Sequence, residues 1–226
     1  MPRAHRSLRG LLATAALTIG SSAAVGGCSS TPDVMVLDLA YRPTNQPDQG
    51  KLVGAVPIAA SSQVWVNPVV DLHPEGSRIG VSQEEDNNAV YFGPNGLPPA
   101  DFMRAALVQA LPPLGVPLGN DPNTATHVLE VRMSRFWAVE GNLYQTWISA
   151  TVLLADKYGN VLWQSEITGF GKRWGRTFNA EPYIHAFSDA ALDFSHNLAL
   201  NPAFRRAAAT LPAVPAYTAP AAPTEG

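Results

Sequence analysis

Cysteine is almost absent: the 226-residue sequence contains one, Cys28. A single cysteine cannot form a disulfide within the chain, which excludes a disulfide-stapled fold. Charged side chains are also sparse, at 15% of the residues against 46% hydrophobic ones. A chain of this length and composition can bury a substantial core, so a disordered polyelectrolyte is excluded as well.

Basic residues are few, with 15 Lys and Arg against 18 Asp and Glu. Arg3, Arg6 and Arg9 fall in a segment that we expect to be removed, and subtracting these three leaves 12 basic against 18 acidic side chains. Nucleic-acid binding requires clustered Lys and Arg that face phosphates. We therefore expect no nucleic-acid partner.

Catalytic motifs are also missing. The sequence has no nucleophile elbow of the Gly-x-Ser-x-Gly type and no zinc-binding helix with two histidines around a glutamate. Residues 169–176 are rich in glycine and basic side chains but lack the spacing of a phosphate-binding loop. We expect a non-enzymatic protein without a cofactor.

The first 28 residues have the pattern of an export signal. The three early arginines precede an apolar stretch, Leu11 to Val25, that is too short to span a bilayer comfortably, since spanning needs about 20 apolar residues. The stretch ends in Ala24-Val25-Gly26-Gly27-Cys28, which resembles a bacterial lipobox. An ordinary cleaved signal followed by an incidental cysteine is the alternative.

The lipobox resemblance implies that Cys28 is cleaved free and acylated, which anchors the protein to a membrane. Several acyl chains anchor effectively irreversibly, because each buried methylene contributes about 0.8 kcal/mol. Ser29 follows the cysteine, where aspartate is the usual signal for retention in the inner membrane. The resemblance therefore implies sorting to the periplasmic face of the bacterial outer membrane.

The predicted organisation has four parts. Residues 1–27 form a signal peptide, 28–33 the acylated cysteine and a tether, 34–207 one folded domain, and 208–226 an Ala- and Pro-rich disordered tail.

Residues 127–173 form the centre of the predicted domain. Apolar and polar side chains alternate there with the period of half-buried strands, and the turns Glu140–Asn142 and Lys157–Asn160 separate three such runs. We expect a three-stranded antiparallel meander. Helices are predicted over residues 99–111 and 181–199, each with an apolar stripe, and shorter strands over 35–41, 63–71, 79–81 and 89–92.

The order of these elements resembles the YajG-like family of outer-membrane lipoproteins. The resemblance covers about residues 34–207, and the segments that carry it are Val64–Asp71, Ile79-Gly80, Leu97–Leu111, Val128–Arg135, Val139–Tyr144, Asp156–Asn160 and Asn201–Phe204. It implies an α/β fold of the α+β type, with a mixed sheet and two helices packed on one face. It implies no activity.

Three groups of side chains are candidate sites. Phe136, Trp137, Tyr144 and Trp147 gather near the first hairpin and are either an interface anchor for a protein partner or core residues. Lys172, Arg173 and Arg176 either bind an anionic lipid or a peptidoglycan carboxylate or form a solvated loop.

The third group comprises His185, Asp189, Asp193 and His196, spaced along one stripe of the second predicted helix. Four ligands spread over three helical turns span about 16 Å, so one zinc ion cannot reach all of them. We expect no metal site and a solvated face.

Three hypotheses for function remain open. The first is an adaptor lipoprotein that docks an envelope protein, and the second is a binder of peptidoglycan or anionic lipid. The third is an auxiliary lipoprotein of a lipid-transport ABC system. The sequence leaves the oligomeric state open.

Overall fold

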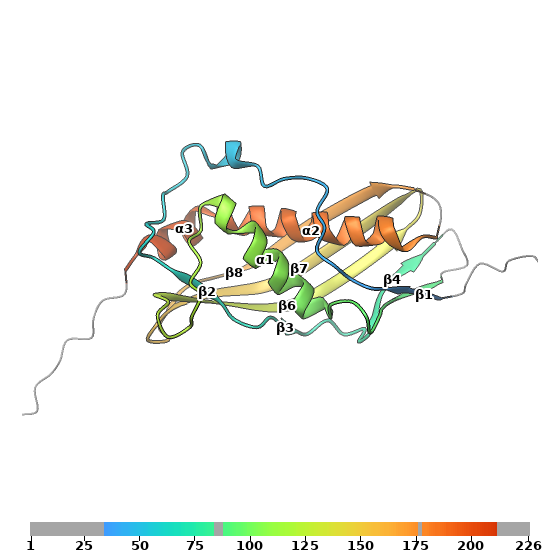
Figure 1. Ribbon diagram of the computed structural model, residues 1–226, viewed down its shortest axis with the longest axis horizontal. Helices are drawn as coiled ribbons and strands as arrows, with labels where there is room; N and C mark the ends of the chain where they lie inside the picture. The colour runs from blue at the N-terminus through green and yellow to red at the C-terminus, as the bar shows by residue number, and fades with distance from the viewer. Residues whose placement is uncertain (1–33, 84–87, 176–177, 212–226) are drawn as a thin grey trace, which may run out of the picture. The chain divides into compact units, whose positions relative to one another are not determined.

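The computed structural model describes residues 34–83, 88–175 and 178–211 (Figure 1). The predicted signal peptide, Cys28, Arg176 and the chain beyond residue 211 lie outside the described residues. In the described part of the chain, none of the helices combines the length and apolar character needed to cross a membrane.

One mixed eight-stranded sheet forms the body of the domain, as predicted. Along its main path the strands follow the order β1-β5-β4-β6-β7-β8, and the short β2 and β3 pair with β6 beside β4. The strand bounds are Val34–Leu37 (β1), Val64–Val66 (β2), Val70–Asp71 (β3), Arg78–Ser82 (β4), Ala89–Phe92 (β5), His127–Glu140 (β6), Leu143–Asp156 (β7) and Val161–Trp174 (β8).

The predicted meander is confirmed by β6, β7 and β8, which pair in antiparallel fashion along their full lengths. The first hairpin closes through Gly141 and Asn142, and the second contains Gly159 at φ 87°, a left-handed conformation that favours glycine. A bulge between Met133 and Arg135 shifts the register of β6. The predicted strand over residues 63–71 is interrupted at Pro68, between β2 and β3.

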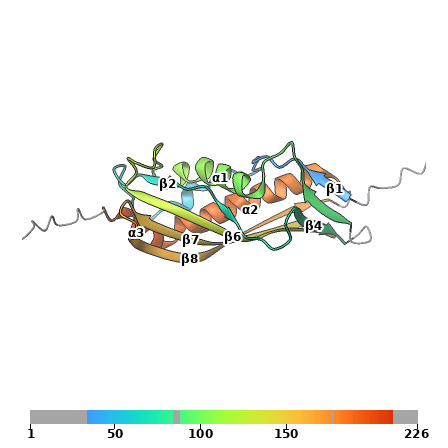
Figure 2. The ribbon, with the colours of Figure 1, turned by 90° about the horizontal axis from the view of Figure 1, so that it is seen from below.

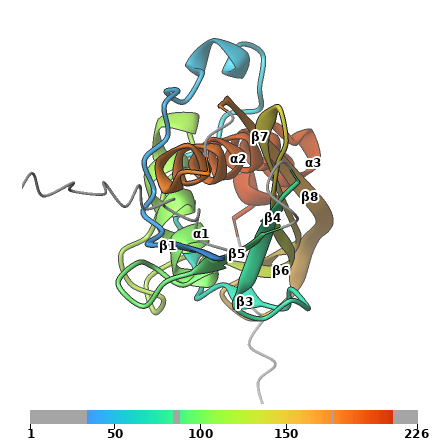
Figure 3. The same cartoon turned by 90° about the vertical axis from the view of Figure 1, so that its right-hand side faces the viewer.

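Helices cover one face of the meander (Figure 2). They are α1 (Pro99–Ala110), α2 (Ala180–Leu200) and α3 (Pro202–Ala209), besides two short 3-10 segments at Gln49–Leu52 and Pro112–Leu114. Seen end-on, the strands curve around one side of α1 and α2 (Figure 3). The two predicted helices are thus confirmed, and residues Pro202–Ala209 form a third helix that buries the Phe204 ring.

Helix α2 packs very closely on β8 because two glycines face it. A Cβ atom added at Gly169 would lie 2.6 Å from the backbone nitrogen of Phe194, and one at Gly171 would collide with the carbonyl oxygen of Ala186. The hydroxyl of Thr146 donates to the same Ala186 carbonyl at 2.7 Å. This contact fixes α2 over β7 and β8, and it leaves the opposite face of these strands, here called the outer face, turned away from the helices.

Candidate functional site

Three aromatic side chains form a row across the outer face of the meander. Trp137 on β6 is the register partner of Trp147 on β7, and Trp147 is the partner of Phe170 on β8. The centroids of the Trp147 and Phe170 rings lie 5.6 Å apart. Both tryptophans are half-buried and Phe170 is 42% exposed. We call these three residues the aromatic row.

Two arginines lie over the tryptophans of the row. The guanidinium carbon of Arg78 is 5.7 Å from the ring centroid of Trp137, and that of Arg135 is 5.0 Å from the ring centroid of Trp147. Contacts of this kind contribute about 0.5–1 kcal/mol at exposed sites. The bulge after Met133 brings Arg135 to the outer face, where strict alternation from Met133 would have turned it inward.

Among the described residues, basic side chains gather around the aromatic row on the outer face. Lys172, two residues beyond Phe170 on β8, adds an exposed ammonium group to the two arginines. Glu166 is the acidic side chain on the outer face of β8, and it lies away from the aromatic row. Its register partner Thr151 is four residues from Trp147 along β7, a distance of about 13 Å. A partner bearing carboxylates would therefore match this surface.

The structure divides the four aromatic residues that the sequence grouped together. Trp137 and Trp147 lie on the outer face, whereas Phe136 and Tyr144 are fully buried on the face that meets the helices. Phe136 stacks on Phe187 of α2, with centroids 4.3 Å apart and planes 3° apart. Phe136 and Tyr144 therefore cannot contact a partner, and including them in the surface was wrong. Neighbours in a strand point to opposite faces.

The basic group of β8 is divided in the same way. Lys172 is exposed, whereas the partly buried Arg173 points to the helix side and forms an ion pair with the buried carboxylate of Asp189 on α2. Arg176 lies outside the described residues. Asp189 therefore already balances the charge of Arg173. Of the three residues of the predicted anion site, Lys172 is the one described side chain that has no ion-pair partner.

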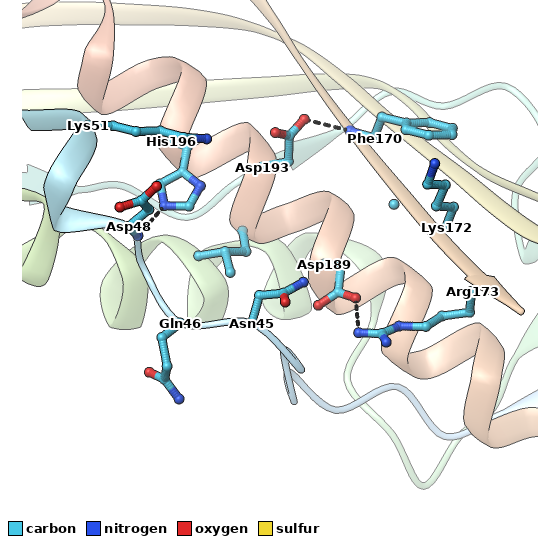
Figure 4. A pocket seen from close by; sticks show the side chains of 12 residues that line it. Asn45, Gln46, Asp48, Lys51, Phe170, Lys172, Arg173, Asp189, Asp193 and His196 are labelled. Carbon is cyan, nitrogen blue, oxygen red and sulfur yellow. Dashed lines mark hydrogen bonds and ion pairs between the residues drawn. The ribbon is translucent and has the colours of Figure 1, made fainter.

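A cleft of about 520 Å³ opens between α2, β8 and a loop that we call the strap, residues 42–51 (Figure 4). The strap lies along the polar stripe of α2: Thr44 donates its backbone N–H to Asp189 at 2.9 Å, and Asp48 donates its backbone N–H to Nε2 of His196 at 2.9 Å. Figure 4 shows Asp189 between the strap and Arg173.

The predicted solvated stripe on α2 is therefore partly wrong. Asp189 and His196 are buried beneath the strap, whereas Asp193 and His185 are half-buried. Asp193 accepts a hydrogen bond from the backbone N–H of Phe170 at 3.0 Å, on the open edge of β8. In the described part of the chain, no group of three or more histidine, cysteine, aspartate or glutamate side chains is placed to hold a metal ion.

His196 is a neutral acceptor in this arrangement. Its Nε2 accepts from Asp48, so the ring proton resides on Nδ1. Burial lowers the pKa of His196, and the nearby ammonium of Lys51 lowers it further, against the opposing effects of Asp193 and Asp48. Protonation of Nε2 would place its N–H against the N–H of Asp48 and so break this hydrogen bond.

Sequence reasoning missed a buried carboxylate at the tip of the first hairpin. Glu140 was assigned to a turn but is fully buried, and its Oε2 accepts a hydrogen bond from the Tyr183 hydroxyl at 2.9 Å. Oε1 has no hydrogen-bond partner in the described structure. Burial raises the pKa of Tyr183, and the neighbouring Glu140 raises it further. The alternation of β6, continued two residues past Ala138, would have turned Glu140 inward.

No family model and no curated protein matches the chain. Some solved structures are similar to the chain at low sequence identity. Protein XCC0632 of Xanthomonas campestris, from the family DUF330, is 14% identical with a TM-score of 0.47, covering 74% of this chain and 92% of its own. A minor lipoprotein of Acinetobacter baumannii is 16% identical with a TM-score of 0.33, covering 62% and 94%.

The PelC dodecamer of Paraburkholderia phytofirmans is 14% identical with a TM-score of 0.36, covering 61% of this chain and 92% of that one. Likenesses this distant assign neither a family nor an activity to the chain. The YajG-like family therefore stays a prediction from the sequence.

Proposed function

We propose that the protein is a non-enzymatic lipoprotein of the YajG-like kind, anchored through Cys28 to the periplasmic face of the outer membrane, where it docks an envelope protein. The docking surface is the outer face of β6–β8, centred on the aromatic row. The partner is a protein whose contacting surface carries carboxylates.

The aromatic row with its two arginines is the observation that carries this proposal. Tryptophan and arginine are enriched among the residues that dominate binding energy at protein interfaces. Trp137 and Trp147 are held in place before binding, because each is paired across strands and covered by an arginine. A surface ordered in advance loses less conformational freedom on association.

Photo-crosslinking in intact envelopes tests the docking surface. A photo-reactive amino acid at Thr168, an exposed residue on the outer face beside Phe170, should capture one dominant protein. The matched control is the same amino acid at Val108, which is 41% exposed on α1 of the opposite layer. Equal capture at the two positions, or capture of no protein at Thr168, would contradict the proposal.

The cleft supports a second candidate function, binding of an anionic peptidoglycan fragment or lipid. Lys51 and Lys172 both line the cleft, and among the described residues neither belongs to an ion pair. Lys51→Glu should then lower retention of the protein on isolated peptidoglycan, whereas Lys157→Glu, at the distant second turn, should not. Unchanged retention in Lys51→Glu argues against this candidate. The ABC-system hypothesis stays a prediction.

A further inference from the structure

The start of β1 and the end of β8 lie at the same end of the sheet. A single row of register partners connects them across all six strands of the main path: Val34, Ala89, Val81, Val139, Gln145 and Lys172. Trp174 lies two residues beyond Lys172, as the partner of Leu143 at the tip of the first hairpin. Figure 1 shows β1 and the arrowhead of β8 on the right-hand side.

The length of chain before β1 limits how far this end can lie from the anchor. Five residues, 29–33, separate Cys28 from Val34. A fully extended segment of this length spans about 20 Å. With Cys28 acylated, as the proposed function holds, the end of the sheet that carries Lys172 and Trp174 is the end near the membrane.

Trp174 is the most exposed aromatic side chain at this end. It is 83% exposed on the outer face, whereas Trp137 and Trp147 are half-buried. An indole ring is apolar with one polar N–H group, which makes the membrane–water interface its favoured environment. The exposed ammonium of Lys172 stands one position along the same face, and anionic headgroups attract such charges.

We propose that Trp174 and Lys172 form a second contact with the membrane, in which the indole inserts among phospholipid headgroups and the lysine pairs with anionic ones. This inference rests on the lipid anchor of the proposed function. One acylated residue leaves the domain free to rotate about its tether. A second contact at the same end restricts this rotation and so orients the sheet, with its aromatic row, relative to the bilayer.

Fluorescence quenching by brominated lipids tests this contact. The mature acylated protein, which begins at Cys28, is placed in vesicles of phosphatidylethanolamine with about one quarter phosphatidylglycerol, the anionic component. Lipids brominated close to the headgroup should quench part of the tryptophan emission. Trp174→Phe should lose most of that quenching, whereas Trp137→Phe should keep it. Lys172→Glu should weaken the quenching in these vesicles but not in vesicles without phosphatidylglycerol.

The outcomes separate this inference from the proposed function. Mass spectrometry first establishes whether Cys28 is acylated; an unmodified cysteine contradicts the anchor and the inference together. If Cys28 is acylated but brominated lipids do not quench the emission, or quench it equally in Trp174→Phe, the membrane contact of Trp174 is contradicted and the anchor is not. Protection of Trp174 by a second copy of the chain or by a protein partner, in place of lipid, contradicts it as well.

Discussion

Arg135 lies over the indole ring of Trp147, with its guanidinium carbon 5.0 Å from the ring centroid. The same ring is the register partner of Trp137 on one side and of Phe170 on the other. The arginine and the aromatic row therefore form one surface, whose contribution to folding and to binding can be separated by substitution.

Truncation of Trp147 should cost far less stability than truncation of Phe136. Trp147→Ala removes cross-strand and cation–π contacts on a half-buried face, and we expect a loss of about 1–2 kcal/mol. Phe136→Ala removes a fully buried ring that stacks on Phe187, and we expect about 3–5 kcal/mol. Urea unfolding of both variants measures the difference. Equal losses would show that Trp147 belongs to the core.

A methyl group at Gly169 should strongly destabilise the domain. The added Cβ would press on the backbone of α2 at Ala190 and Phe194, so we expect Gly169→Ala to cost about 1–3 kcal/mol through overpacking. Gly141→Ala is the matched control, because the nearest atom to its added Cβ is 3.8 Å away. Thermal unfolding compares the two variants. A neutral Gly169→Ala would mean that α2 does not pack this closely.

Removal of the Asp189 carboxylate should release the strap. Asp189→Ala leaves Arg173 without its ion partner in a partly buried position and deprives Thr44 of its acceptor. We expect a loss of about 1–3 kcal/mol, because the pair is partly screened by solvent. Limited proteolysis should cut residues 42–51 faster in this variant. Asp193→Ala, which leaves the Arg173 and Thr44 contacts intact, should not have this effect on the strap.

The stability of the domain should fall as the pH drops below about 6.5. The native pKa of His196 is lowered, so between its lowered value and the usual 6.5 the unfolded chain binds a proton that the folded chain does not. Stability from this histidine is complete above pH 6.5 and is lost progressively toward the lowered pKa. The pKa of buried His127 is lowered as well, which acts in the same direction.

His196→Gln tests this assignment, because the glutamine oxygen can accept from Asp48 but does not titrate. Urea unfolding at several pH values should show a shallower loss of stability between pH 6.5 and 5 in the variant than in the original protein. An unchanged slope would assign the pH dependence to other groups.

Local patterns predicted the meander and the helices well. Strand alternation and the glycine-containing turns located β6, β7 and β8, and the apolar stripes located α1 and α2, because these signals act over a few residues. Such local signals could not predict the position of the strap. Its contacts join Thr44 to Asp189 and Asp48 to His196, about 145 positions away, from a segment with no periodicity of its own.

The aromatic surface was predicted only in part, because strand alternation was not applied to the residues grouped there. Phe136 and Trp137 are adjacent in sequence, and their grouping by proximity ignored the alternation that the same strand displays. Extending the first hairpin from its Glu140–Tyr144 pair would have matched Trp137 with Trp147, whereas the pairing of Trp147 with Phe170 depends on a register shift between Leu154 and Ala155. The position of Arg135 depends on a bulge that carries no clear local signal.

Charge reversal at Arg135 tests docking through the aromatic row. Arg135→Glu places a carboxylate over Trp147, whereas the control Arg132→Glu changes the same charge on the same strand at an arginine that faces Glu130 at 3.6 Å. With the photo-reactive amino acid at Thr168, we expect Arg135→Glu to lower capture of the envelope partner at least about tenfold, the equivalent of 1.4 kcal/mol. Arg132→Glu should leave most of the capture. Equal capture by both variants would contradict docking through the aromatic row.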